Sequence, residues 1–247
     1  MLLAVEHLKE PGVMLRVGTW NGDVGSFVVP AALANIKSSA WPIDGWIRLN
    51  LRADRIELEP VLMPNQQSPA FLKTITRQLE DTQDQGGGTS NQAQSNPAQQ
   101  ATSVEPSNDI FVRVPGAKWV TGSAQTYRFK NGTGVLRPKL DNRYELVWAG
   151  QPFAFTVQNG LRDRNGRAYG DGAQYTIEYD GNKYEYSLGE FGWDSQIMAI
   201  ADLDGDGKPD FIITVGGNNS GYEAILLSSR AKPGKNPPTA SLRAIGC

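Results

Sequence analysis

Residues 202–210 read DLDGDGKPD and lie between two apolar runs, QIMAIA (196–201) and FIITVG (211–216). Both runs are short, and they are rich in apolar and β-branched residues, a composition that favours strands on both sides of the acidic segment. The acidic side chains fall on alternate positions, and glycines stand where the chain must turn sharply. The stretch therefore predicts a β-hairpin whose two strands are joined by an acidic loop.

The acidic loop has the composition of a calcium site. Ca²⁺ takes about six to eight oxygen ligands and often combines carboxylates with a backbone carbonyl and water. An EF-hand is excluded, because the twelfth position of the loop is Ile213 rather than a glutamate. A bound cation would relieve the repulsion among neighbouring carboxylates and fix the turn, which gives the ion a structural role. The expected ligands are the side chains of Asp202, Asp204, Asp206 and Asp210 and the backbone carbonyl of Lys208.

The loop and its flanks resemble the FG-GAP or VCBS-type repeat, a strand–loop–strand unit that carries a DxDxDGxxD calcium loop. The resemblance covers residues 197–227 and occurs once in the chain. IADLDGDGKPDFIITVGG, followed by GYEAILLSSRAKPG and a terminal GC, is also similar to the C-terminal part of small exported bacterial proteins. The resemblance implies a calcium loop and a fragment of fold, but no activity. The sequence has no internal repeat of about 40 to 60 residues, so a closed propeller is not expected.

The composition changes abruptly near Gln83, and this change divides the chain. From there to Ser107 the sequence is polar, with no aromatic residue and with Val104 as its one aliphatic residue larger than alanine. Such a segment cannot bury enough apolar surface to offset its ordering entropy. We predict an N-terminal module (1–81), a disordered polar linker (82–109) and a C-terminal domain (110–247). A polar insertion within one continuous domain is the alternative.

The remaining pattern is mostly β. A proline-initiated segment with apolar residues at helical spacing predicts one amphipathic helix between Ser68 and Leu79. Turns are predicted at Asn131-Gly132, Asn159-Gly160 and Asp180-Gly181-Asn182. The predicted fold is a small N-terminal β-plus-helix module and a C-terminal antiparallel β domain with a calcium-binding hairpin loop. Outside the acidic hairpin, the predicted strands cover residues 13–18, 26–30, 46–51, 55–60, 110–114, 126–130, 144–148, 153–157, 175–179 and 183–188.

Several classes of function find no support in the sequence. The 24 Lys and Arg residues balance 26 Asp and Glu residues, and no basic run could follow a phosphate backbone, so we expect no nucleic-acid partner. No apolar run approaches the roughly 18 residues of a membrane span. His7 and Cys247, each the sole residue of its type, lack a nucleophile motif, so no catalytic residue is assigned. Glu190 and Asp194, around two aromatic residues, leave a glycosidase-like hydrolase open.

We expect a calcium-binding, non-catalytic binding or structural protein of the bacterial periplasm or cell surface. Weak Asp-rich sites need the millimolar calcium that is found outside the cytosol. The N-terminal residues lack the continuous apolar core of a signal peptide, so this location implies that an export signal has been removed. The alternatives are a carboxylate-dependent hydrolase and a toxin-associated or inhibitory partner protein. The ligand, protein or carbohydrate, stays open, as do the oligomeric state and the pairing of Cys247 with another chain.

Overall fold

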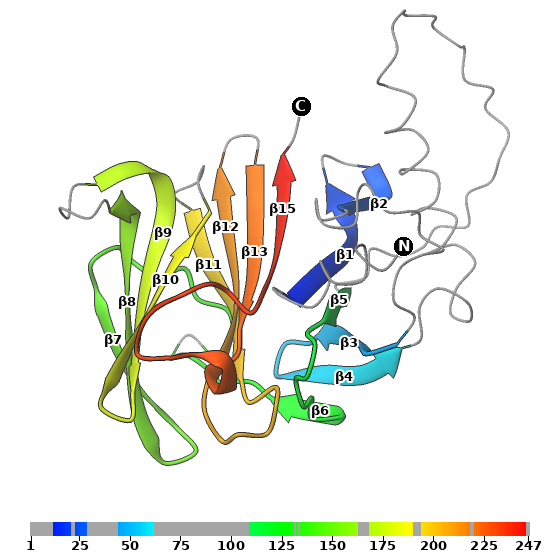
Figure 1. The fold of residues 1–247 in the computed structure, drawn as a ribbon, viewed down its shortest axis with the longest axis horizontal. Coiled ribbons are helices and arrows are strands. Elements are labelled where there is room, and N and C mark those ends of the chain that lie inside the picture. The colour runs from blue at the N-terminus through cyan, green and yellow to red at the C-terminus, as the bar shows by residue number, and fades with distance from the viewer. Residues whose placement is uncertain are drawn as a thin grey trace, which may run out of the picture.

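The computed structural model describes residues 12–20, 23–28, 44–61, 109–130, 132, 134–162, 168–189, 194–217 and 220–245. Within these ranges the chain is mostly β, with its strands in two sheets (Figure 1). The predicted helix between Ser68 and Leu79, residues 82–108 of the predicted linker, His7 and Cys247 lie outside the described residues. The described part of the chain contains no helix with the length and apolarity of a transmembrane segment.

The larger sheet combines strands from both sides of the predicted linker. Its order is β11-β12-β13-β15-β1-β5-β3-β4-β6, and β2 pairs with β1. β15 runs parallel to β1, and β5 pairs antiparallel with both β1 and β3. Strands before and after residues 82–108 therefore share one sheet, while the division of the chain into domains stays a prediction. The strands are β1 (Gly12–Trp20), β2 (Asp23–Val28), β3 (Trp46–Leu51), β4 (Arg55–Val61), β5 (Asp109–Arg113), β6 (Gly122–Gln125), β11 (Asp194–Ala201), β12 (Asp210–Gly217), β13 (Ser220–Leu226) and β15 (Ala240–Ile245).

The smaller sheet has the order β14-β10-β9-β8-β7. It is antiparallel except for β14, which runs parallel to β10. A short 3₁₀ helix, η2 (Ser228–Arg230), connects β13 of the larger sheet to β14 of the smaller one. The strands of the smaller sheet are β7 (Arg143–Trp148), β8 (Gln151–Arg162), β9 (Ala168–Tyr179), β10 (Asn182–Leu188) and β14 (Gly234–Asn236).

The acidic hairpin belongs to a middle layer that is buried on both faces. Figure 1 shows β11, β12, β13 and β15 between the smaller sheet and the strands β1 to β6. Ile213 of β12 packs in one core with Phe155 and Tyr175 of the smaller sheet. Ile212, which immediately precedes Ile213, packs in a second core with residues of β3 and β5. Successive strand residues point to opposite faces, so burial of both faces explains the nearly continuous apolar runs that flank the loop.

Two local predictions are wrong. Residues 126–130 were expected to form a strand, but they run beside β11 without joining a ladder, and the Tyr127 amide donates to the Ile200 carbonyl at 2.8 Å. Asn159-Gly160 was expected to form a turn, but it lies inside β8 at a β-bulge, which a glycine accommodates readily. The turn predicted at Asp180-Gly181-Asn182 is confirmed, with Asp180 and Gly181 as its two central residues and Asn182 as the first residue of β10. Both central residues have positive φ, 51° and 72°, as a two-residue hairpin turn requires.

Because β12 lies in the middle of three layers, neighbouring residues on its two faces should contribute about equally to the free energy of unfolding. We expect Ile212→Ala and Ile213→Ala each to lower the free energy of unfolding by about 2–5 kcal/mol, because each leaves a cavity in a different core. Urea unfolding at a fixed calcium concentration measures both losses. Val147→Ala is the control, since Val147 is 60% exposed. A near-zero loss at either isoleucine would contradict burial of both faces.

Candidate metal centre

The loop between β11 and β12 is folded by its own acidic side chains. The Asp202 carboxylate accepts hydrogen bonds from the amides of Gly205, at 2.7 Å, and Gly207, at 3.0 Å. Both glycines have positive φ, 77° and 80°, which other residues rarely adopt. The Asp206 carboxylate accepts from the Lys208 amide at 2.8 Å. These bonds turn the chain tightly enough to bring its carboxylates together.

Asp210, the first residue of β12, is fully buried. One carboxylate oxygen accepts from the Leu203 amide at 2.7 Å. The other accepts from the Ser228 amide at 2.7 Å and from the Ser228 hydroxyl at 2.8 Å. Burial, followed by the nearby charge of Asp204, holds the pKa of Asp210 well above its usual range. The carboxylate is thus anchored between the loop and η2.

Asp204 provides the observation that bears most directly on a metal. Its Oδ2 accepts a hydrogen bond from the Ser229 hydroxyl, whereas its Oδ1 is buried and has no hydrogen-bond partner among the described residues. Burial is also the main reason that the pKa of Asp204 is raised. A buried polar atom without a partner is costly, and a cation would supply that partner.

The carboxylates of the loop fit calcium in chemistry and in spacing. Asp202, Asp204 and Asp210 each offer one oxygen, and these three atoms all lie within 4.8 Å of one another. Oxygens bound to one Ca²⁺ at about 2.3–2.6 Å lie at most about 5 Å apart, so a single ion can contact all three. All three are hard, anionic oxygen donors, the type of ligand that calcium prefers.

The other two expected ligands are placed differently. Both oxygens of Asp206 lie 3.0 Å from the Ser228 hydroxyl, and Asp206 is outside the three-carboxylate cluster. The Lys208 ammonium pairs with Asp180 at 2.8 Å and lies 5.5 Å from the centre of the Tyr179 ring, so it ties the loop to the β9–β10 turn. Asp206 and the Lys208 carbonyl stay predictions as ligands.

Besides Asp180, three further partners of the loop were missed by sequence reasoning. Ser228 and Ser229 of η2 donate to its carboxylates, as described above. On another side, the Val120 amide donates to the Leu203 carbonyl at 2.9 Å. These residues are far from the loop in sequence and follow no recognisable spacing, so only the folded chain reveals them.

The candidate acidic pair of a hydrolase gains no support. Asp194 is largely exposed and lies 3.6 Å from Arg137 in an ion pair. Its proposed companion, Glu190, and the two aromatic residues between them lie outside the described residues. The hydrolase therefore stays an untested alternative.

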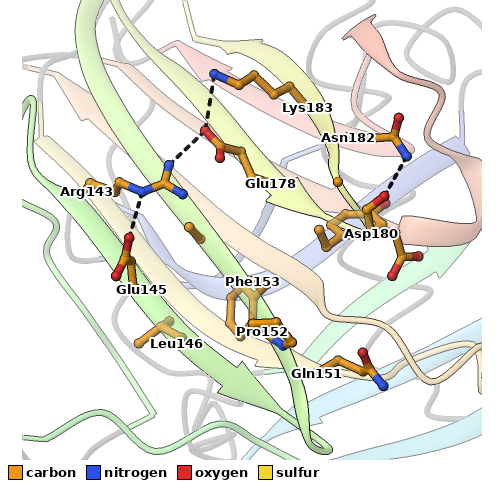
Figure 2. Close-up of a pocket in the computed structure, with 13 residues that line it drawn as sticks. Arg143, Glu145, Leu146, Gln151, Pro152, Phe153, Glu178, Asp180, Asn182 and Lys183 are labelled. Carbon is orange, nitrogen blue, oxygen red and sulfur yellow. Dashed lines mark hydrogen bonds and ion pairs between the residues drawn. The ribbon is translucent and has the colours of Figure 1, made fainter.

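A surface hollow of about 520 Å³ lies over β7, β8 and the β9–β10 turn (Figure 2). Figure 2 shows that its cations face carboxylates: Arg143 contacts Glu178 at 2.8 Å, and Lys183 contacts the same carboxylate at 3.5 Å. Arg143 also pairs with Glu145 at 3.1 Å. The hydrogen bond from Arg143 lowers the pKa of Glu178. A lowered pKa favours the charged carboxylate, which cannot donate a proton as a general acid.

Comparison with known proteins supports the resemblance seen in the sequence. The FG-GAP repeat model matches residues 196–225, from β11 through the acidic loop and β12 into β13. No curated protein and no solved structure matches the chain. FG-GAP repeats occur in extracellular or surface proteins. The match, a single copy, indicates a β-rich binding or structural domain.

Proposed function

We propose that this chain is a calcium-binding, non-catalytic binding or structural protein of the bacterial periplasm or cell surface. The observation that carries the proposal is the buried Asp204 Oδ1, which has no hydrogen-bond partner in the described part of the chain and belongs to one of three clustered carboxylates. The cluster occupies the part of the chain that matches the FG-GAP repeat. When bound, calcium supplies positive charge that offsets the repulsion among these carboxylates.

The surroundings of the loop favour a structural role for the ion. Ser228 and Ser229 hold the loop to η2, Val120 holds it to the segment after β5, and Lys208 holds it to Asp180. These contacts come from η2, from the segment that joins β5 to β6 in the larger sheet, and from the β9–β10 turn of the smaller sheet. An ion bound by Asp202, Asp204 and Asp210 would therefore stiffen a junction rather than an isolated turn.

The proposed location follows from calcium availability. Sites of this class bind calcium weakly and fill where its concentration is millimolar, outside the cytosol. The occurrence of FG-GAP repeats in extracellular or surface proteins supports the same compartment.

Calcium should raise the thermal stability of the whole chain, because a ligand that binds the native state alone stabilises it by mass action. At a concentration about 100 times the Kd, we expect the Tm to rise by roughly 5–10 °C above its value in EDTA. Differential scanning calorimetry in EDTA, CaCl₂ and MgCl₂ measures the effect. An equal rise with magnesium, or no rise with calcium, would count against the site.

Asp204→Asn should weaken calcium binding by more than about tenfold, because it removes a charged ligand while keeping the side chain's shape. Isothermal titration calorimetry gives the affinity. Asp54→Asn is the matched control, since Asp54 is a half-buried aspartate that pairs with Arg55 and Arg128 away from the loop. An equal loss of calcium affinity in both variants would show that the measured heat of binding does not come from this loop.

Ser228→Ala should lower the free energy of unfolding by about 1.5–3 kcal/mol, because the hydroxyl donates to the carboxylates of Asp206 and Asp210. Chemical unfolding at one fixed calcium concentration measures the loss. The control is Ser123→Ala, at an exposed position of β6. If Ser228→Ala and Ser123→Ala have the same free energy of unfolding, Ser228 does not anchor the loop.

A further inference from the structure

A second hollow, of about 590 Å³, lies between η2 and the segments that carry Gly12 and Val114. Its walls are largely apolar, and three prolines, Pro115, Pro237 and Pro238, contribute to them. Arg230 and Lys232 also line it, and the described residues that line it include no carboxylate. The described lining therefore combines apolar walls with two cations that no carboxylate of that lining balances.

The two cations are free of acidic partners in the described part of the chain. No carboxylate there forms an ion pair with Arg230 or Lys232, and both residues are exposed. The hollow of Figure 2 differs in this respect, because both of its cations, Arg143 and Lys183, already contact Glu178. Among the described residues that line these two hollows, only Arg230 and Lys232 are cations without a carboxylate partner.

The residues around the cations hold them in place. The Arg230 guanidinium donates to the Pro115 carbonyl at 2.7 Å, which leaves its other N–H groups for a ligand. Asn236 fixes the backbone at Lys232: its amide nitrogen donates to the Lys232 carbonyl at 2.7 Å, and its oxygen accepts from the Lys232 amide at 2.9 Å. The prolines have restricted backbones as well. A site that is already ordered loses less entropy when a ligand binds.

We propose that this hollow binds an acidic peptide segment, whose carboxylates contact Arg230 and Lys232 while its apolar atoms lie on the proline walls. Arginine is well suited to carboxylates because its N–H groups can donate in parallel. A sugar acid is less favoured, since the described residues that line the hollow include no aromatic ring on which a sugar could stack. The inference rests on the proposed binding role and names the chemistry of the partner.

The test uses fluorescein-labelled hexaglutamate and fluorescence anisotropy with the full chain. Titrations are run in saturating calcium, because Ser229 of this hollow also contacts the Asp204 carboxylate. We expect saturable binding of hexaglutamate and none of hexaglutamine. Lys232→Gln should weaken the binding by roughly two- to fivefold, the range that one exposed ion pair can supply.

Lys235→Gln is the matched control, because Lys235 is an exposed lysine three positions away that does not line the hollow. Binding that is unchanged in Lys232→Gln, or equally weakened in both variants, would overturn the proposal. Displacement of hexaglutamate by oligogalacturonate at a lower concentration than by unlabelled hexaglutamate would overturn it as well. Calorimetric calcium binding to the same samples separates the two proposals: normal calcium binding without peptide binding refutes only this one.

Discussion

The Asp210 carboxylate lies fully buried at the start of β12, where hydrogen bonds from Leu203 and Ser228 hold it. Burying a carboxylate is costly unless it is paired or hydrogen-bonded, so these donors must stay in place for the strand to begin where it does. Ser228 lies 18 residues further along the chain, and its contact therefore fixes η2 against the loop. The same geometry brings Asp204 close to Asp210 and concentrates negative charge that a divalent cation would offset.

The position of this charged loop follows from the burial of its hairpin on both faces. β11 and β12 lie in the middle layer, so their connecting loop is within reach of both sheets and of η2. The Lys208 ammonium pairs with Asp180 in the β9–β10 turn of the smaller sheet, and the Leu203 carbonyl accepts from the Val120 amide in the segment that precedes β6. An ion at this point would act on contacts among several segments, which is why we propose a structural role for it. The hollow beside η2 is joined to the same junction through Ser229.

The sequence was sufficient where the signal is local. The apolar runs around residues 202–210 became β11 and β12, and Asp180-Gly181 formed the expected turn because its residues tolerate positive φ. Local patterns could not reveal the parallel pairing of Gly12 with Ala240, since those residues are far apart in the chain. Residues 126–130 have the composition of a strand. The segment nevertheless bonds to β11 through the Tyr127 amide without forming a ladder, and local composition cannot predict this. Ser228 escaped notice for the same reason: its role depends on tertiary proximity to Asp206 and Asp210.

Hydrogen exchange of the whole chain, compared in calcium and in EDTA, tests most directly whether the acidic loop holds its neighbouring segments together. Amide exchange reports local opening, so segments that depend on one another lose protection together. We predict that removal of calcium lowers the protection of the Leu203, Val120 and Ser228 amides together, because each of these amides is bonded within the junction. Faster exchange confined to residues 202–210, with Val120 and Ser228 unchanged, would contradict the coupling of the loop to its surroundings.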